Sequence, residues 1–326
     1  MMNPLTGLYG AATALRNGLF DRGVLSSRRL EQPVVSVGNL SVGGSGKTPF
    51  VIALGELLKV RGIRFDVLSR GYGRKTRGAL VVEPDGNARA ADFGDEPLLI
   101  ARRLGVPVIV GESRYAAGRL AEQKFQPQLH LLDDGFQHRS LARDFDIVLM
   151  TEADFDDRLL PSGRLREPLS SLQRADAIVL PAGLELEPPS RRDAASRVSQ
   201  KPIWRIERQL VLSNVPAAPI VFCGIARPEQ FFAKVRAAGI APAAEISFRD
   251  HHAYNRRDIE RLLAMRAKLG ADVFLTTEKD AVNLESSTLR EELMPLTVAA
   301  LNLTIDRPAD LVNTILSRIA KRKPRS

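Results

Sequence analysis

The fold is decided by the stretch Gly38-Asn-Leu-Ser-Val-Gly-Gly-Ser-Gly-Lys-Thr48, which lies between two apolar runs. The run before it, Pro33–Val37, is short and β-branched, and the run after it, Phe50–Val60, is helical in pattern. A glycine-rich turn between a strand and a helix clusters backbone N–H groups around a phosphate at the helix N-terminus. In this pattern Lys47 reaches the β- and γ-phosphates, and the hydroxyl of Thr48 is a ligand of Mg²⁺. The stretch therefore predicts a nucleotide triphosphate site.

One position departs from the usual P-loop pattern, G-x-x-x-x-G-K-[ST], because Ser41 stands where the first glycine is expected. A guanine-specific Asn-Lys-x-Asp motif is not evident, since Thr277-Glu-Lys-Asp280 lacks the asparagine. ATP with Mg²⁺ is therefore the expected cofactor pair. The residues predicted to bind ATP are Gly43, Gly44, Ser45, Gly46, Lys47 and Thr48.

The chain around this stretch alternates between strand-like and helix-like segments. Short apolar runs at 65–68, 106–110, 129–132, 147–150 and 177–180 are separated in several places by helical patterns such as 97–104 and 113–124. This alternation predicts an α/β fold of the P-loop NTPase type, with a mostly parallel sheet and helices on both faces.

A second alternating region follows a break at 181–201, and it predicts a second, smaller α/β domain. The length of 326 residues also fits two domains at roughly 150 residues each. We expect an N-terminal segment at 1–30, a P-loop kinase domain at 31–205 and a C-terminal α/β domain at 206–326.

Composition narrows the class of protein. The single cysteine, Cys223, excludes an internal disulfide, and the absence of an 18-residue apolar run argues against a transmembrane helix. The 47 basic and 38 acidic residues give a net charge of +9, which favours an anionic partner such as nucleic acid, anionic lipid or a phosphorylated substrate. Aromatic residues make up only 6%, and no DNA- or RNA-binding motif is present, so a nucleic-acid-dependent ATPase is the weakest of these hypotheses.

The first thirty residues carry an apolar stripe close to helical spacing, which consists of Leu5, Leu8, Tyr9, Ala12, Leu15, Leu19 and Phe20. Arginines lie within or just after it. This pattern favours either an amphipathic segment on an anionic membrane surface or a helix packed on the domain. Four glycines weaken the helix prediction, and periodicity alone leaves both interpretations open.

Acidic and basic loops follow several predicted strands. Asp133 and Asp134 end an apolar run and could hold a metal ion, or they could be a solvated acid pair. Gly135–His138 follows this acidic pair directly, and Ser69–Arg74 and Pro161–Pro168 follow other predicted strands. Because ligand sites of α/β proteins gather at the carboxyl ends of strands, these loops favour a phosphorylated sugar as acceptor.

A set of motifs, in order along nearly the whole chain, resembles the tetraacyldisaccharide 4'-kinase family. These motifs are Val37–Pro49, Ser69-Arg-Gly-Tyr-Gly73, Gly94-Asp-Glu-Pro97, Asp133-Asp-Gly-Phe-Gln-His138, Leu165-Arg-Glu-Pro168, Phe222–Ala226, Phe248-Arg-Asp-His251 and Thr276–Asp280. Ser41 in the P-loop also fits the family pattern.

The resemblance implies transfer of the γ-phosphoryl group of ATP, with Mg²⁺, to the 4'-hydroxyl of a tetra-acylated glucosamine disaccharide 1-phosphate. The product would be lipid IVA in lipid A biosynthesis. The implied partners are this lipid and an anionic membrane surface, with no nucleic acid and no obligate protein partner. The implied location is peripheral, on the cytoplasmic face of the inner membrane, which favours the membrane interpretation of residues 1–30. The alternative is a soluble P-loop small-molecule kinase or an ATP-dependent ligase.

The resemblance also implies roles for individual residues. Asp95 would be the catalytic base and His251 its dyad partner, although by spacing alone Asp95 could cap a helix and His251 could be an exposed loop residue. Thr48, with Asp133 or Asp134 and with Glu96, would hold Mg²⁺. The residues implied for the disaccharide site are Tyr72, Arg114, Gln137, His138, Arg166 and Glu167.

Overall fold

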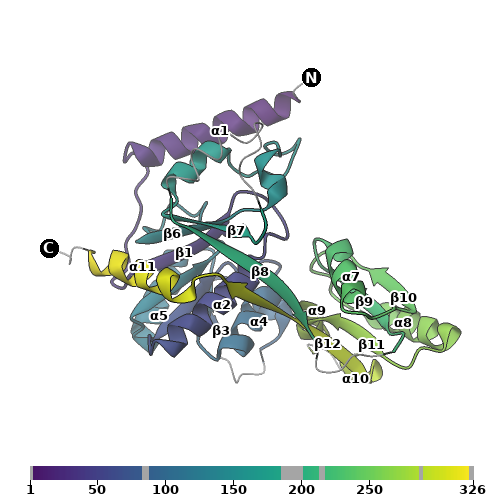
Figure 1. Cartoon of the computed structure of the whole chain (residues 1–326). Helices are drawn as coiled ribbons and strands as arrows, with labels where there is room; N and C mark the ends of the chain where they lie inside the picture. The colour runs from purple at the N-terminus through teal and green to yellow at the C-terminus, as the bar shows by residue number, and fades with distance from the viewer. Residues whose placement is uncertain (1–2, 83–87, 185–200, 213–216, 286–288, 323–326) are drawn as a thin grey trace.

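The computed structural model describes residues 3–82, 88–184, 201–212, 217–285 and 289–322. The predicted break at 181–201 therefore lies largely outside the described residues. Within them, the strands form one mixed sheet in the order β10-β9-β11-β12-β8-β7-β6-β1-β5-β2-β4-β3 (Figure 1). The strands are β1 (Val34–Asn39), β2 (Phe65–Ser69), β3 (Leu80–Val82), β4 (Val108–Val110), β5 (Leu129–Asp133), β6 (Phe145–Leu149), β7 (Ala177–Pro181), β8 (Ile203–Val211), β9 (Ile220–Cys223), β10 (Ala244–Ser247), β11 (Phe274–Thr277) and β12 (Leu296–Ile305).

Helices cover both faces of this sheet, as the sequence predicts. In its first part β4, β2, β5, β1, β6, β7 and β8 are parallel, and β3 is antiparallel at the edge. The helices among the described residues are α1 (Pro4–Asp21), α2 (Lys47–Val60), α3 (Ala90–Phe93), α4 (Asp95–Leu104), α5 (Arg114–Phe125), α7 (Pro228–Ala237), α8 (Arg256–Leu269), α9 (Glu278–Glu285), α10 (Leu289–Glu292) and α11 (Pro308–Ala320), with 3₁₀ turns at Glu152–Phe155 and Leu169–Arg174.

Successive residues of the central strands point to opposite faces of the sheet, and each face packs against its own layer of helices. On β1, Val35 and Val37 face a core that α2, α4 and α11 cover, whereas Val34 faces the smaller core under α5. Both sides of the central strands are buried and largely apolar, which is typical of parallel sheets. The predicted α/β fold class is confirmed.

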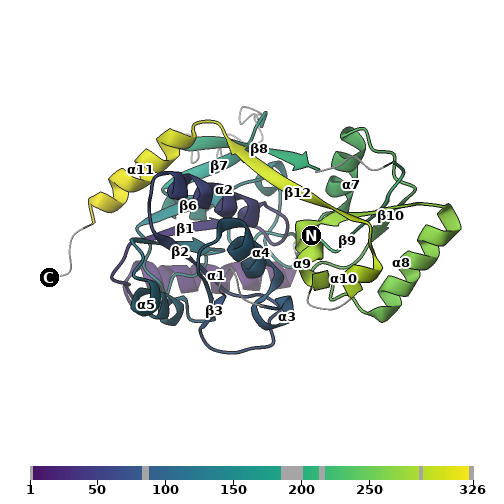
Figure 2. The same ribbon diagram turned by 90° about the horizontal axis from the view of Figure 1, so that it is seen from below.

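A two-stranded ribbon connects the two parts of the sheet (Figures 1 and 2). β8 pairs in parallel with β7 and antiparallel with β12, and β12 continues into the parallel group of β11, β9 and β10. After the ribbon, α11 returns to the core of the first part, where Leu311, Val312 and Ile315 are buried. The three-part division at residues 30 and 205 stays a prediction, and α11 places part of the C-terminal region on the first core.

The sequence pattern does not identify β8. Trp204 and Ile206 are buried, but the next residues on the same face, Arg208 and Leu210, are only partly buried because they line an open cavity. The residues on this face of β8 change from apolar to charged partway along the strand. The sequence therefore lacks the regular apolar alternation by which a strand is recognised. The N-terminal stripe, in contrast, does form a helix, with Pro4 in its first turn and the Asn3 side chain accepting a hydrogen bond from the Leu5 N–H at 3.0 Å.

A buried ion pair lies near the amino ends of β2 and β5. His130 and Asp66 are fully buried and directly opposite in the parallel register, with His130 Nδ1 2.9 Å from Asp66 Oδ1, and His130 Nε2 lies 3.4 Å from Glu122 Oε1. Burial alone would lower the pKa of His130, but the hydrogen bonds to the two carboxylates outweigh it and raise the pKa to about 9.

We expect the free energy of unfolding to fall as the pH rises from about 7 through about 9. The folded-state pKa of His130 is above its ordinary value of 6.5, so its stabilisation is complete below pH 6.5 and is lost as the folded-state group deprotonates. The shift of the His130 pKa from 6.5 to about 9 corresponds to up to about 3 kcal/mol in the free energy of unfolding. Urea unfolding at pH 7 and pH 9.5 will measure it, and His130→Gln should flatten the dependence. Equal pH slopes in both proteins would contradict this account.

Candidate active site

A cavity of about 990 Å³ lies at the carboxyl ends of β1, β2 and β5, between the two parts of the sheet. The P-loop, the first turns of α2 and α4 and the loops after β2 and β5 line one side. Residues of β8, α7, β12 and the loop before α8 line the other side, and α1 borders the cavity. All the predicted functional loops except the one carrying Arg114 therefore contribute to one cavity, although His138 itself does not line it.

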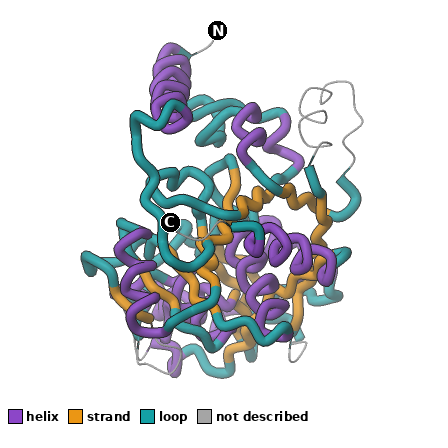
Figure 3. Tube along the Cα trace, turned by 90° about the vertical axis from the view of Figure 1, so that its left-hand side faces the viewer, coloured by secondary structure: helices purple, strands orange, loops and turns teal. Residues whose placement is uncertain are grey.

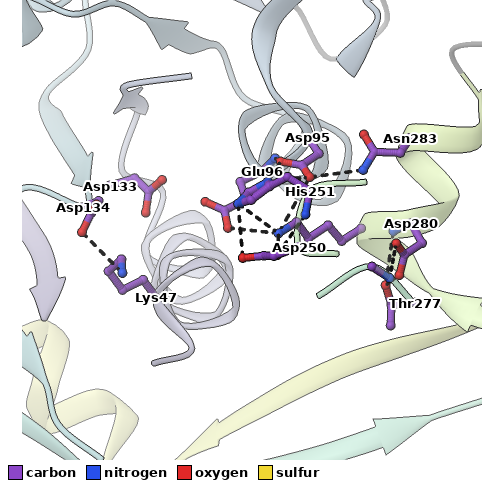
Figure 4. Close-up of polar contacts among 12 residues, drawn as sticks. Lys47, Asp95, Glu96, Asp133, Asp134, Asp250, His251, Thr277, Asp280 and Asn283 are labelled. Carbon is purple, nitrogen blue, oxygen red and sulfur yellow. Dashed lines mark hydrogen bonds and ion pairs between the residues drawn. The ribbon is translucent and has the colours of Figure 1, made fainter. Parts of the chain in front are cut away.

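The P-loop owes its shape to three glycines with positive φ. Gly43 (79°), Gly44 (22°) and Gly46 (85°) take conformations that residues with a side chain rarely adopt, and Gly46 is the N-cap of α2. Lys47 begins α2, and its Nζ donates to Asn39 Oδ1 at 3.0 Å and lies 3.4 Å from Asp134 Oδ1 (Figure 4). The turn thus directs its N–H groups and one ammonium group into the cavity, as phosphate binding requires.

Two neighbouring acids at the end of β5 differ in their electrostatics. Burial and the charges of Glu96 and Asp134 raise the pKa of Asp133 to about 7. Burial would also raise the pKa of Asp134, but the charges of Lys47 and Arg166 outweigh it and lower the pKa. Asp134 is therefore the ionised partner of two cations, whereas the charge of Lys47 lowers the pKa of Asp133 less than burial and the two neighbouring acids raise it.

The donor set fits a magnesium ion. Asp133 Oδ2 accepts a hydrogen bond from Ser69 Oγ at 3.1 Å, whereas its Oδ1 is buried without a partner. Thr48, Glu96 and Asp134 line the same cavity. Among the described residues no group of three or more metal-binding side chains is preassembled. Mg²⁺ commonly uses one or two carboxylates together with phosphate oxygens and waters, so this arrangement suits it.

Asp95 and His251 come from different parts of the sheet and form a close pair (Figure 4). His251 Nδ1 lies 3.0 Å from Asp95 Oδ1 and 2.9 Å from Oδ2. Gly94, with φ of 95°, is the N-cap of α4, so Asp95 follows the cap position and its buried carboxylate faces the histidine. His251 itself has a positive φ of 55°, a backbone conformation often found at functional sites.

Burial would raise the pKa of Asp95, but the hydrogen bond from His251 and the charge of Lys279 lower it overall. Burial would lower the pKa of His251, and the contact with Asp95 raises it. At neutral pH Asp95 is therefore a carboxylate that can accept a proton, and the imidazole orients it.

Sequence reasoning did not assign roles to two further residues around Asp95. Lys279 Nζ lies 3.8 Å from both Asp95 Oδ2 and Glu96 Oε1, and it donates to Asp250 Oδ1 at 3.0 Å. Asn283 Nδ2 donates to Asp95 Oδ2 at 3.2 Å. Lys279 lies within the motif Thr276–Asp280, and this position could have marked it as a candidate site residue. Asn283 lies outside every motif, so the sequence carries no signal for it.

The residues expected at the disaccharide site divide into two groups. Tyr72, Gln137, Arg166 and Glu167 line the cavity, and Arg166 Nη1 donates to Asp134 Oδ2 at 2.9 Å. Arg114 and His138 do not line it, since Arg114 is buried and donates to the Gly111 and Glu112 carbonyls. Their substrate role stays a prediction.

The region around His138 is strongly cationic. Burial and the charges of Arg114, Arg143, Arg16 and Arg70 lower the pKa of His138 to about 4, so the imidazole is neutral at neutral pH. Burial and the charge of Arg70 lower the pKa of Arg114 to about 10. These charges favour an anionic ligand beside the cavity.

Comparison with known proteins identifies the family. A family model described as tetraacyldisaccharide-1-P 4'-kinase matches residues 1–320. The chain belongs to the tetraacyldisaccharide-1-P 4'-kinase family. It is therefore a phosphotransferase of lipid A biosynthesis, and the resemblance found in the sequence motifs is confirmed.

Relatives within the tetraacyldisaccharide 4'-kinase family match most or nearly all of the chain. The tetraacyldisaccharide 4'-kinase of Koribacter versatilis is 48% identical over 332 residues and covers 99% of each chain. That of Aquifex aeolicus is 40% identical over 86% of this chain and 89% of its own. A crystal structure of LpxK from Aquifex aeolicus in complex with ATP matches with a TM-score of 0.77 and 35% identity, covering 97% of both chains. These matches favour the kinase over the alternative of a soluble small-molecule kinase or ligase.

Proposed function

We propose that the cavity transfers the γ-phosphoryl group of ATP to the 4'-hydroxyl of a tetra-acylated glucosamine disaccharide 1-phosphate, giving lipid IVA and ADP. The observation that carries this proposal is the position of the Asp95–His251 pair in the same cavity as the P-loop. A base and a triphosphate site facing one space are the two components that phosphoryl transfer to an alcohol needs.

In the proposed reaction Asp95 accepts the proton of the 4'-hydroxyl. The hydroxyl oxygen forms a bond to the γ-phosphorus while the bond between that phosphorus and the β,γ-bridging oxygen breaks, and the electron pair leaves with ADP. The lowered pKa of Asp95 keeps it ionised at neutral pH, so it is ready to accept the proton. His251 donates to the carboxylate and fixes its orientation, and Lys47 contacts the β- and γ-phosphates.

Mg²⁺ would be held by Thr48, Asp133, Asp134 and Glu96. When bound, it would neutralise charge on the phosphate oxygens during transfer. The buried, unpartnered Oδ1 of Asp133 supports this set, because a buried carboxylate oxygen without a hydrogen bond otherwise costs stability.

The disaccharide would bind beside Tyr72, Gln137, Arg166 and Glu167. Arg114 and His138 would act from the cationic region next to the cavity. Arginine suits the 1-phosphate because its planar fork can donate to two oxygens together.

Transfer of label from [γ-³²P]ATP to tetraacyldisaccharide 1-phosphate in detergent micelles tests the proposal. We expect a Mg²⁺-dependent bis-phosphorylated lipid. ATP binding without a labelled lipid product would contradict the proposed acceptor and leave only the nucleotide site.

We propose that the protein attaches to an anionic membrane surface, on the cytoplasmic face of the inner membrane. The N-terminal helix supports the attachment to a membrane surface. Its polar side faces the protein: Thr6 Oγ1 lies 2.5 Å from Ser162 Oγ, and Tyr9 Oη donates to the Arg166 carbonyl at 3.0 Å. Three leucines of the apolar stripe face outward, with Leu5, Leu8 and Leu15 59%, 70% and 63% exposed, whereas Tyr9, Leu19 and Phe20 of the same stripe are partly buried. A surface helix normally buries its apolar side, so this reversed orientation favours a lipid surface. None of the described helices combines the length and apolar content needed to span a bilayer.

Helix α1 lies at one edge of the molecule (Figure 3), and its exposed leucines should govern vesicle binding. Leu8→Glu combined with Leu15→Glu should lower the partition coefficient for anionic vesicles at least about 100-fold, because two leucines lose their burial in lipid. Sedimentation with vesicles measures it, and deletion of residues 1–25 should abolish binding. Val60→Glu with Leu269→Glu, which alters two other exposed apolar residues, is the matched control. Equal binding of both double variants would contradict the proposed role of α1.

A further inference from the structure

Three cationic side chains from β8 and the α7 region lie at the P-loop, on the side of the cavity formed by the second part of the sheet. Arg208 is on β8, Arg227 precedes α7, and Lys234 is within α7. All three line the cavity, and Lys234 Nζ donates to the Arg208 carbonyl at 2.8 Å. The family-like sequence motifs include none of the three residues.

Arg208 packs directly on the turn that would hold phosphate. Its Nη2 donates to the Ser45 carbonyl. A Cβ placed on Gly46 would lie only 2.3 Å from that Nη2 and 2.7 Å from the guanidinium carbon. Gly46 is therefore required for close approach of the arginine as well as for its positive φ, and the guanidinium group lies against the P-loop.

Arg227 lies against the neighbouring glycine of the same turn. A Cβ on Gly44 would be 3.2 Å from the Cγ, Cδ and Nε atoms of Arg227. The Nη2 atom of Arg227 is buried and has no hydrogen-bond partner. Arg208 and Arg227 thus lie against the P-loop, and Arg227 has a buried N–H donor without a hydrogen-bond partner.

Neither arginine nor Lys234 forms an ion pair within the part of the chain that the structure describes. Burial lowers the pKa of Arg208, and the positive charge of Arg227 lowers it further. Burial also lowers the pKa of Arg227. The charges of Asp154 and Asp157 oppose this lowering for Arg227 without outweighing it. Grouping partly buried cations costs free energy, and an anion between them would remove that cost.

We propose that Arg208 and Arg227 bind the phosphate chain of the nucleotide, so that the triphosphate is held between the P-loop and the β8–α7 side of the cavity. This proposal rests on the proposed function, because it takes ATP as the ligand of the P-loop. The phosphate chain is favoured over the lipid 1-phosphate because both arginines contact P-loop glycines, whereas Tyr72 and Gln137 belong to other loops. On binding, Arg208 exchanges the Ser45 carbonyl for phosphate oxygens, which are stronger acceptors for a guanidinium group.

The test compares dissociation constants for ATP, ADP, AMP and adenosine, without lipid, by isothermal titration calorimetry. Arg208→Gln and Arg227→Gln should each weaken ATP binding roughly 10- to 100-fold, the usual effect of losing a charge-assisted hydrogen bond, and should leave adenosine binding unchanged. Arg205→Gln is the matched control, since Arg205 lies on β8 with its side chain toward the Pro181 and Leu184 carbonyls. It should change none of the four constants.

Several outcomes would overturn the proposal. Unchanged ATP binding in both variants would exclude phosphate contact, and equal losses for ATP and adenosine would indicate a structural role only. Weaker binding of a short-chain disaccharide 1-phosphate, with normal ATP binding, would place the arginines at the lipid instead. Should Arg208→Gln fail to fold, Arg227→Gln supplies the same comparison from a loop position. Failure of the unaltered protein to bind ATP would instead contradict the proposed function itself.

Discussion

Replacing Asp95 with asparagine should lower turnover by about 10²–10⁴-fold, the range for loss of a positioned general base. Asparagine has nearly the same shape and can still contact His251 and Asn283, but its amide cannot accept the hydroxyl proton. The P-loop is not altered by this change, so the dissociation constant for ATP should stay near the unaltered value. Steady-state turnover in micelles and ATP titration measure the two quantities separately.

The matched control for this experiment is Asp92→Asn. Asp92 lies in α3, three residues before Asp95, and pairs with Arg89 at 2.9 Å, outside the cavity. The Asp92→Asn variant should retain normal turnover. Near-normal turnover of Asp95→Asn would remove Asp95 from the chemical step, and a combined loss of turnover and ATP binding would indicate damage to the fold.

Replacing Lys47 with methionine should lower kcat/KM by roughly 10²–10³-fold, the usual effect of losing one preorganised electrostatic contact to the reacting group. Methionine keeps most of the aliphatic length but removes the ammonium group that lies 3.4 Å from Asp134. The charge of Lys47 also lowers the pKa of Asp133, so the substitution should raise that pKa above about 7. The variant should therefore need a higher pH, or more Mg²⁺, to reach its own maximum rate.

The Lys47→Arg variant tests whether activity depends on the positive charge at position 47 or on the shape of the lysine side chain. If charge alone matters, arginine should restore most of the activity, whereas a requirement for the compact ammonium group predicts little recovery. A full rate for Lys47→Met at neutral pH would show that Lys47 does not contact the reacting phosphates.

The sequence could predict most of the first part of the sheet, because strand–turn–helix units carry strong local signals. The P-loop is one such signal, and the acids at the end of β5 are another, since the carboxyl end of a parallel strand is where ligand sites gather. The Asp95–His251 contact was expected only from a motif resemblance. The two residues are 156 positions apart, and spacing in the sequence does not reveal a contact made between different parts of the sheet.

Other features depend on tertiary structure that local patterns do not encode. Arg208 has an ordinary neighbourhood in the sequence, and its position at the P-loop follows only from the pairing of β8 with β7. The orientation of α1 was likewise open, because an apolar stripe fits either a core or a membrane. Only the contacts of Thr6 and Tyr9 with the protein identify which side faces outward.

The β8–β12 ribbon has a mechanical consequence for the timing of the reaction. A two-stranded ribbon twists more readily than its hydrogen bonds break, so relative movement of the two parts should be a rotation about this connection. Such a rotation would separate α4 from α9 and break the polar contacts Asp95–His251 and Arg103–Glu278. The open form would then admit lipid and nucleotide while Asp95 is separated from His251. We expect this separation to protect ATP from hydrolysis by water before the lipid binds.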